Sequence, residues 1–131
     1  MITYKETTQI KPEELADVFR RSGIRRPYQD LERIRMMIEH CQLLITAWDG
    51  DLMIGAARAL TDYSYCCYLS DLAVDRDYQQ KGIGKRLVEL VQEKIGDTCA
   101  LILISAPEAV DYYRKLGFER SDRAFIIPRT R

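Results

Sequence analysis

Apolar residues recur along this chain at two spacings, which divide it into helices and strands. Helical spacing predicts helices over about 12–22, 29–40, 83–95 and 107–117. Alternating or continuous apolar runs predict strands over 2–6, 43–48, 52–60, 65–74 and 99–104. Residues 118–127 are expected to supply one or two closing strands. This order predicts an α+β fold with a mixed sheet flanked by helices.

Short polar turns separate the central strands. Asp49-Gly50-Asp51 joins two β-rich runs, and Asp-Gly accepts positive φ, so this turn predicts a hairpin. Asp62-Tyr63-Ser64 makes the next turn. The strands from residue 43 to residue 74 are therefore expected to form an antiparallel meander.

Composition excludes several classes of protein. The 131 residues include 20 Lys plus Arg and 20 Asp plus Glu, and this net charge of zero favours neither nucleic-acid nor membrane binding. No apolar run approaches the roughly 20 residues that span a bilayer, and the first residues lack a signal-peptide pattern, so we expect a cytoplasmic protein. The four cysteines and one histidine show no metal-ligand spacing, which argues against a metal site. The length predicts a single domain over 1–131.

One turn indicates an anion-binding site. Gln79-Gln80-Lys81-Gly82-Ile83-Gly84-Lys85 follows an apolar strand and opens an amphipathic helix. A helix start exposes unpaired N–H groups and the positive end of the helix dipole, and glycine removes the Cβ that would block a phosphate. A crossover from strand 65–74 to strand 99–104 would place this turn at the carboxyl end of a strand, where open sheets bind ligands.

Two common phosphate-binding loops do not match this turn. A P-loop, G-x-x-x-x-G-K-[ST], needs an earlier glycine and a Ser or Thr after the lysine, but Arg86 follows Lys85. A dinucleotide-binding loop, G-x-G-x-x-G, needs a glycine where Leu87 stands, and it belongs to a parallel sheet. The remaining pattern is Q-x-x-G-x-G from Gln79 to Gly84.

A second motif lies on the following helix, at Tyr113-Arg114-Lys115-Leu116-Gly117-Phe118. This Y-x-x-x-G-F motif, together with Q-x-x-G-x-G, resembles the GNAT superfamily of acyl-coenzyme-A-dependent N-acyltransferases. The resemblance extends to the order of elements over nearly the whole chain. It implies a GNAT-type, mostly antiparallel sheet in which strands 65–74 and 99–104 splay apart to admit coenzyme A.

The resemblance also implies how acetyl-coenzyme A is bound. Backbone at Leu72 to Val74 would bond to the pantetheine amides as an added strand would, and N–H groups from about Gln80 to Lys85 would hold the pyrophosphate. Nearby cations would meet the outer phosphates or form a solvated helix face: Lys81, Lys85, Arg114 and Lys115. The expected coenzyme-binding residues are Leu72, Ala73, Val74, Gln79, Gln80, Lys81, Gly82, Ile83, Gly84, Lys85 and Tyr113.

Acyl transfer from a thioester to an amine needs a neutral amine, a stabilised tetrahedral intermediate and a proton for the departing thiolate. A tyrosine hydroxyl, with a reference pKa of about 10, stays protonated at neutral pH and can donate to sulfur. The resemblance assigns this acid role to Tyr113, with Tyr112 as the competing candidate. Alternatively, Tyr113 packs the helix against the sheet with its hydroxyl at the rim.

Asp71 is the leading candidate for the base that receives the amine proton. It interrupts the apolar pattern of strand 65–74, and Ser70-Asp71 resembles acidic pairs that some family members carry on this strand. Ser70 departs from that pattern. Alternatively, Asp71 accepts from backbone N–H groups at a bulge or pairs with Arg58.

The first helices and their loop usually form the acceptor site in this family. The candidate acceptor contacts there are Arg20, Arg21, Arg25, Arg26 and Tyr28, and this cluster favours an anionic or aromatic acceptor. Arg58 would orient an acceptor carboxylate or phosphate, or would pair with Asp71.

These residues predict an N-acetyltransferase that passes the acetyl group of acetyl-coenzyme A directly to a primary amine of a small molecule or a protein. No cysteine occupies a matched catalytic position, which favours direct transfer over an acyl-enzyme. The alternative is a non-catalytic sensor or regulatory module that binds acyl-coenzyme A. Dimers are frequent in the family, and segment 124–127 suits either the edge of a homodimer or an ordinary closing strand.

Overall fold

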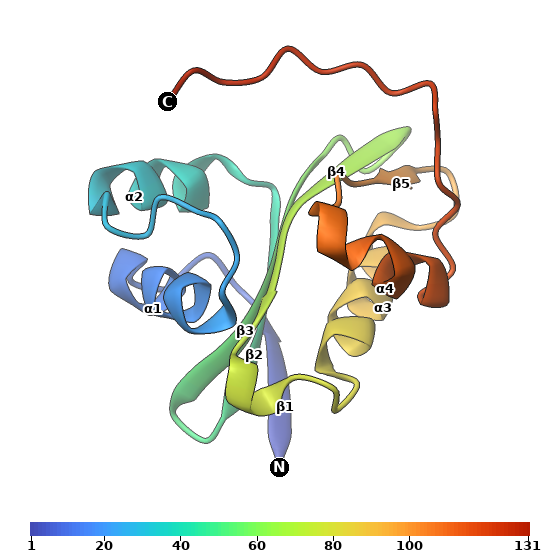
Figure 1. The fold of residues 1–131 in the computed structure, drawn as a ribbon. Coiled ribbons are helices and arrows are strands. Elements are labelled where there is room, and N and C mark those ends of the chain that lie inside the picture. Colours follow the sequence, from blue (N-terminus) through green and yellow to red (C-terminus); the bar gives the residue numbers. More distant parts are fainter.

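A five-stranded sheet forms the centre of the molecule, and helices cover both of its faces (Figure 1). The computed structural model describes residues 1–131. Its elements are β1 (Ile2–Glu6), α1 (Pro12–Ser22), α2 (Leu31–His40), β2 (Leu43–Asp49), β3 (Leu52–Thr61), β4 (Cys66–Val74), η1 (Arg76–Tyr78), α3 (Ile83–Ile95), β5 (Ala100–Ile102), η2 (Pro107–Ala109) and α4 (Val110–Lys115). The prediction of an α+β fold with a mixed sheet is confirmed.

Local sequence signals set the ends of α1 as expected. Pro12 occupies the first helical position, and the Glu14 side chain accepts a hydrogen bond of 3.0 Å from the N–H of Lys11. Gly23 ends the helix at a φ of 83°, in the left-handed region that favours glycine.

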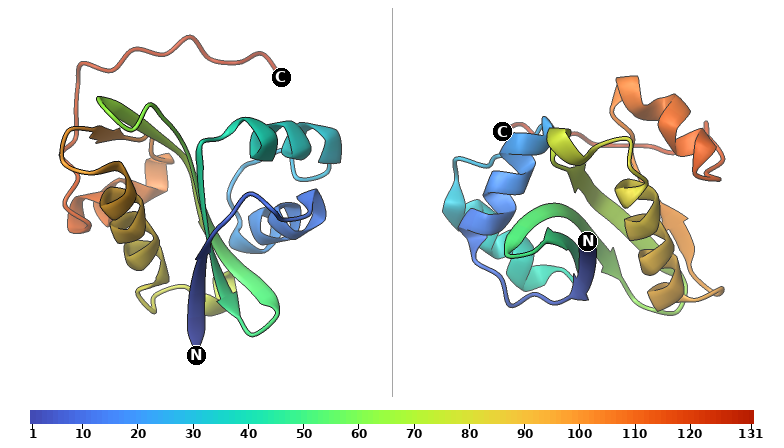
Figure 2. Two further views of the ribbon diagram at one scale, coloured as in Figure 1. Left: turned by 180° about the vertical axis from the view of Figure 1, so that it is seen from behind. Right: turned by 90° about the horizontal axis from the view of Figure 1, so that it is seen from below.

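The sheet separates two apolar cores, and Figure 2 shows from behind and from below the helices that cover its two faces. On one face, Phe19 of α1 and Ile34 of α2 lie buried against the sheet. On the other face, Leu87 and Val91 of α3 fill the second core. Helices α1 and α2 on one face and α3 on the other are therefore held against the sheet by apolar burial.

The last two strands pair at one end only. Strands β1 to β4 are antiparallel neighbours, whereas β4 and β5 are parallel and pair only through Cys66–Tyr68 and Ala100–Ile102. Beyond Tyr68, β4 continues to Val74 without a strand on that side. The predicted strand 99–104 is thus shorter than expected, and the predicted splay of the two strands is present.

A β-bulge at Ser70 changes which face of the sheet β4 side chains occupy. The register moves from Arg58 opposite Asp71 to Ala59 opposite Leu69, so Ser70 is an extra residue. Leu69 therefore packs in the α3 core, whereas Asp71 faces α1 and α2. A strand without a bulge would place Leu69 and Asp71 on one face, so the bulge accounts for their separation.

The prediction of closing strands within 118–127 is also wrong. This segment forms no strand, and Phe125 and Ile127 are 96% and 98% exposed. The tail instead runs from α4 toward α2, where Arg33 donates to the main-chain oxygen of Arg131 at 3.0 Å (Figure 1). Apolar alternation shows that a segment can pair, not that a sheet edge is available to it.

No helix has the length and hydrophobicity needed to cross a bilayer.

Candidate active site

The turn after β4 presents a row of free backbone donors. No group of the chain accepts a hydrogen bond from any backbone N–H between Gln80 and Lys85. The first bonded amide of α3 is that of Arg86, which donates to the Gly82 carbonyl at 3.0 Å. Gly82 has a φ of 81° and is the N-cap of α3. The positive end of the α3 dipole adds to these donors, so the turn can receive the oxygens of a phosphate or pyrophosphate.

The side chain of Gln79 holds this turn in shape. Its amide donates to the Val74 carbonyl at 2.8 Å and to the Ser22 carbonyl at 3.3 Å. The backbone N–H of Gln79 bonds to the Arg76 carbonyl at 3.4 Å. Gln79 therefore ties the turn to β4 and to the end of α1, and the free donors begin one residue later.

The outer edge of β4 offers further backbone groups. The N–H of Asp75 donates to the Ile54 carbonyl at 2.8 Å, which places the main-chain groups of Asp75 on the β3 side. Main-chain groups alternate along a strand, so those of Leu72 and Val74 point to the open side and those of Ala73 point to β3. The main-chain groups of Leu72 and the N–H of Val74 are therefore available to an added strand or an extended ligand, whereas the Val74 carbonyl already accepts from Gln79.

Two tyrosines of α4 stand over this region. A β-carbon on Gly84 would overlap the hydroxyl of Tyr112, so the absence of a side chain there lets α4 approach the first turn of α3. The Tyr113 ring packs edge-on against Tyr112, with 5.3 Å between ring centres, and against Phe118, with 5.7 Å. Both hydroxyl-bearing candidates from the sequence are thus present at the site.

Burial decides the protonation state of Tyr113. Loss of hydration raises the pKa of Tyr113 to about 12, with a smaller contribution from Tyr112. The nearby guanidinium of Arg26 opposes this rise. Tyr113 is therefore a neutral hydroxyl, able to donate a proton, throughout the physiological pH range.

Asp71 lies between two arginines. Its carboxylate is 0% exposed and accepts from the Nε groups of Arg58 on β3 and Arg26 on the loop before α2. Arg58 also donates to the Ser70 hydroxyl at 2.9 Å, and Arg26 donates to the Ser70 carbonyl at 2.7 Å. Since neither oxygen of Asp71 faces an open site, this geometry favours the ion-pair alternative over the base.

The other expected acceptor residues lie nearby with different contacts. Arg25 is exposed, and its side chain makes no hydrogen bond or ion pair within the chain. Tyr28 packs partly buried against the α1–α2 core. Arg26, next to Arg25, is the loop arginine that reaches the sheet. A loop has no regular periodicity that tells which of two adjacent side chains points inward, so the sequence did not show which arginine contacts the sheet.

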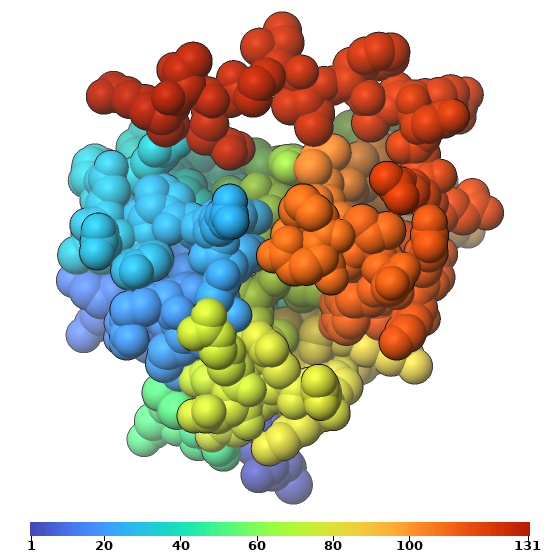
Figure 3. Space-filling view, in the orientation of Figure 1, coloured from blue at the N-terminus to red at the C-terminus, as the bar shows by residue number.

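The candidate site opens on one face of the molecule. Figure 3 shows a hollow between the α1–α2 side and α4, with β4 at its floor and the C-terminal tail above it.

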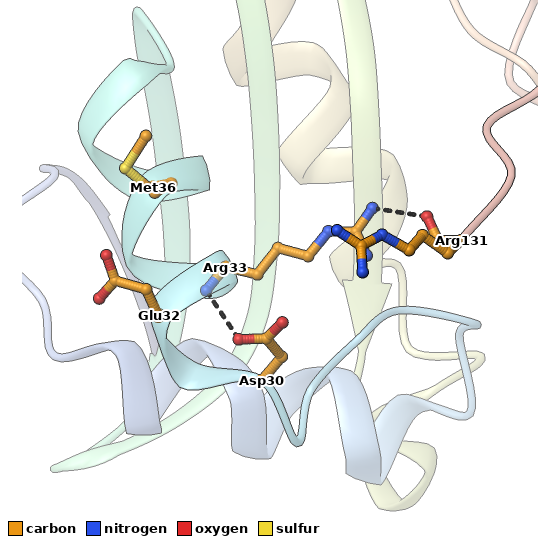
Figure 4. A pocket seen from close by; sticks show the side chains of 5 residues that line it. All are labelled: Asp30, Glu32, Arg33, Met36 and Arg131. Atoms are coloured by element: carbon orange, nitrogen blue, oxygen red, sulfur yellow. Dashed lines mark hydrogen bonds between the residues drawn. The ribbon is translucent and has the colours of Figure 1, made fainter.

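A separate pocket of about 490 Å³ lies where the tail meets α2, lined by Asp30, Glu32, Arg33, Met36 and Arg131 (Figure 4). Nowhere do three or more His, Cys, Asp or Glu side chains gather as a metal site.

The sequence model of the acetyltransferase (GNAT) domain matches residues 9–126. The chain belongs to the GNAT acetyltransferase family. The chloroplastic GCN5-related N-acetyltransferase 2 of Arabidopsis thaliana is 40% identical over 72 residues, covering 51% of this chain and 27% of that protein. Histone acetyltransferase TAP1 of Glycine max is 39% identical over 72 residues, covering 51% and 28%. The GNAT chain thus spans less than a third of either curated relative's length.

Solved structures show the same fold. A GNAT acetyltransferase of Streptococcus pneumoniae has a TM-score of 0.83 and 26% identity, covering 100% of this chain and 99% of that chain. An aminoglycoside N-acetyltransferase, solved in complex with CoA, has a TM-score of 0.75 and 18% identity, covering 99% and 95%. The resemblance and the fold expected from the sequence are both confirmed.

Proposed function

We propose that this GNAT protein transfers the acetyl group of acetyl-coenzyme A directly to a primary amine. The observation that carries the proposal is the row of free N–H donors from Gln80 to Lys85, at the start of α3 and beside the open edge of β4. A turn of this kind suits a pyrophosphate, and an open strand edge suits the amides of an extended pantetheine arm. Membership of the family supports acetyl transfer.

Each part of the coenzyme would meet a different part of the chain. The N–H groups from Gln80 to Lys85 would hold the pyrophosphate. The side chains of Lys81 and Lys85 would face the outer phosphates. The main-chain groups of Leu72 and the N–H of Val74 would bond to the pantetheine amides. The coenzyme supplies the acetyl thioester, and these contacts orient it toward α4.

Tyr113 would act as the general acid. As the amine nitrogen bonds to the acetyl carbon, the C–S bond breaks, and the Tyr113 hydroxyl gives its proton to sulfur and regains one from solvent. The amine proton would leave through water, because the carboxylate of Asp71 already accepts from two guanidinium groups. Tyr112 remains the competing acid because its hydroxyl lies near Gly84.

The acceptor would be an amine of a small molecule or of a protein. Among related proteins, one is named for histones and another for aminoglycosides, so the family includes both kinds of acceptor. A homodimer, formed when the exposed segment 124–127 pairs with a second copy, is a further part of this proposal.

Two measurements test the proposed activity. Calorimetric titration with coenzyme A measures binding, and thiol release from acetyl-coenzyme A in the presence of diverse amines measures transfer. We expect saturable binding and amine-dependent thiol release. Tight binding without turnover on any amine would favour a non-catalytic sensor, and trapping of an acetylated enzyme without acceptor would contradict direct transfer.

A further inference from the structure

Positive charge exceeds negative charge on the acceptor side of β4. Arg26 and Arg58 both pair with Asp71, and no other carboxylate lies within ion-pairing distance of either arginine. Asp71 is 0% exposed, Arg58 is 8% exposed and Arg26 is 27% exposed, so water screens the surplus charge only in part. A desolvated charge without a counter-ion is costly. The surplus indicates that this place receives an anion when the protein works.

The two arginines differ in what they can still bind. Arg58 is enclosed, with its Nη groups donating to the Ser70 hydroxyl at 2.9 Å and to the Met37 carbonyl at 3.5 Å. Arg26 is 27% exposed, and its Nη groups donate to the carbonyls of Ser70 and Arg25. Each Nη carries two hydrogens, so the exposed edge of Arg26 retains donors for another acceptor.

The position of Arg26 connects this charge to the reaction. It lies on the loop before α2, its Nε group is held by Asp71, and its charge acts on Tyr113 of α4. Since the Arg26 charge lowers the pKa of Tyr113, an anion bound by Arg26 would lie near the tyrosine expected to donate a proton. The coenzyme phosphates are assigned elsewhere, to the turn at the start of α3.

We propose that the amine acetylated by this protein also carries a carboxylate, which the Arg26 guanidinium binds. The proposal rests on the proposed acetyltransferase function and names the class of its acceptor. Asp71 and Arg58 are positioning residues in it, because they fix Arg26 and contact no substrate. A guanidinium matches the two oxygens of a carboxylate and repels a second ammonium group. Amino carboxylates are therefore favoured over polyamines.

Matched acceptors can test this charge preference. Amino carboxylates of increasing chain length are compared with amino alcohols of the same length, which have an amine but no anion. We expect kcat/KM for the best carboxylate to exceed that of its alcohol by about 10- to 100-fold, as for a hydrogen bond to a charged group. Calorimetry on protein saturated with coenzyme A provides a second readout that needs no turnover.

Three variants assign the preference to its residue. Arg26→Gln should abolish the difference between carboxylate and alcohol, and Arg26→Lys should retain part of it. Arg35→Gln removes the same charge from the surface of α2, where Arg35 pairs with Glu32 and Glu39, and should leave the preference unchanged. Thermal unfolding of each variant shows whether the fold is intact.

The outcomes separate this inference from the proposed function. Equal kcat/KM and equal binding for carboxylates and alcohols would overturn the inference while leaving acetyl transfer in place. A carboxylate preference that survives in Arg26→Gln would also overturn it. Absence of turnover with every amine would instead contradict the proposed function, and the binding comparison would then decide whether Arg26 receives a carboxylate.

Discussion

At the scale of single residues, the environment of each side chain determines its chemistry. Tyr113 is a neutral acid because loss of hydration raises its pKa, and Asp71 is enclosed by arginines because a bulge turns it toward the α1–α2 loop. Both residues stood out in the sequence by type and position. Their surroundings come from segments far away in the chain, so the sequence alone left their roles open.

The two α4 tyrosines can be separated by removing one hydroxyl at a time. We expect Tyr113→Phe to lower kcat by about 10²-fold, the effect of losing a general acid, while binding of coenzyme A changes little. Tyr112→Phe is the matched control on the same helix. Thiol release measures both variants, and a larger loss in Tyr112→Phe would move the acid role to Tyr112.

The raised pKa of Tyr113 makes a prediction about pH. The rate should rise as the acceptor amine loses its proton and should not fall until the pH approaches the pKa of about 12. Folding favours the protonated tyrosine, so this residue also destabilises the fold as pH rises from about 10, its unfolded value, toward about 12. Rate profiles and urea unfolding of wild type and Tyr113→Phe measure the two effects. A rate that already falls near neutral pH would contradict this prediction, because Tyr113 does not ionise there.

Asp71→Asn distinguishes an ion pair from a catalytic base. If Asp71 neutralises Arg26 and Arg58, its replacement should lower the free energy of unfolding by about 3–5 kcal/mol, because the enclosed Arg58 and the partly buried Arg26 lose their carboxylate. Urea unfolding measures this change. A variant of normal stability whose kcat is lost would restore the base assignment.

At the scale of elements, the motif segment folds much as its residue types predict. Gly82 is the N-cap at which α3 begins. Strand β4 ends at Val74, before the turn, as its apolar run indicates. The one-turn helix η1 was not predicted, and a bulge entered only as one alternative for Asp71, without its position at Ser70. Such single-residue irregularities depend on how a strand pairs with its neighbour, and the periodicity of one strand does not contain that information.

Gly82→Ala tests the shape of the turn. Its φ of 81° should make alanine cost about 1–2 kcal/mol in unfolding free energy and should weaken coenzyme A binding by shifting the free N–H groups. Gly50→Ala, with a φ of 60° in the β2–β3 hairpin, is the matched control for backbone strain. Calorimetry should show weakened binding in Gly82→Ala only. Equal binding losses would indicate a general effect of instability.

At the scale of the whole molecule, the candidate site is assembled from four separated parts. These are the α1–α2 loop, β4, the start of α3 and α4, which meet around the hollow in Figure 3. The C-terminal tail completes no sheet in this chain, and Phe125 and Ile127 remain almost fully exposed. A second copy could cover them by strand pairing.

Deleting residues 124–131 tests the proposed homodimer. We expect light scattering to show a dimer for the full chain and a monomer for the shortened one. Replacing Phe125 and Ile127 with serine keeps the length and should have the same effect, because the exposed apolar side chains are removed. A full chain that is monomeric at micromolar concentration would contradict the dimer.

The sequence by itself determined the order of elements, the antiparallel meander and the turn at Gln80–Lys85. These features follow from hydrophobic periodicity, glycine positions and motif spacing, which are local in the chain. The tertiary structure decided that Gln79 ties the turn to α1, that Arg26 rather than Arg25 reaches Asp71, and that residues 118–127 form no strand. Each of these depends on which distant groups pack together. Backbone preferences depend on residues that are adjacent in the sequence. A buried charge is compensated only where folding brings an oppositely charged residue from elsewhere in the chain next to it.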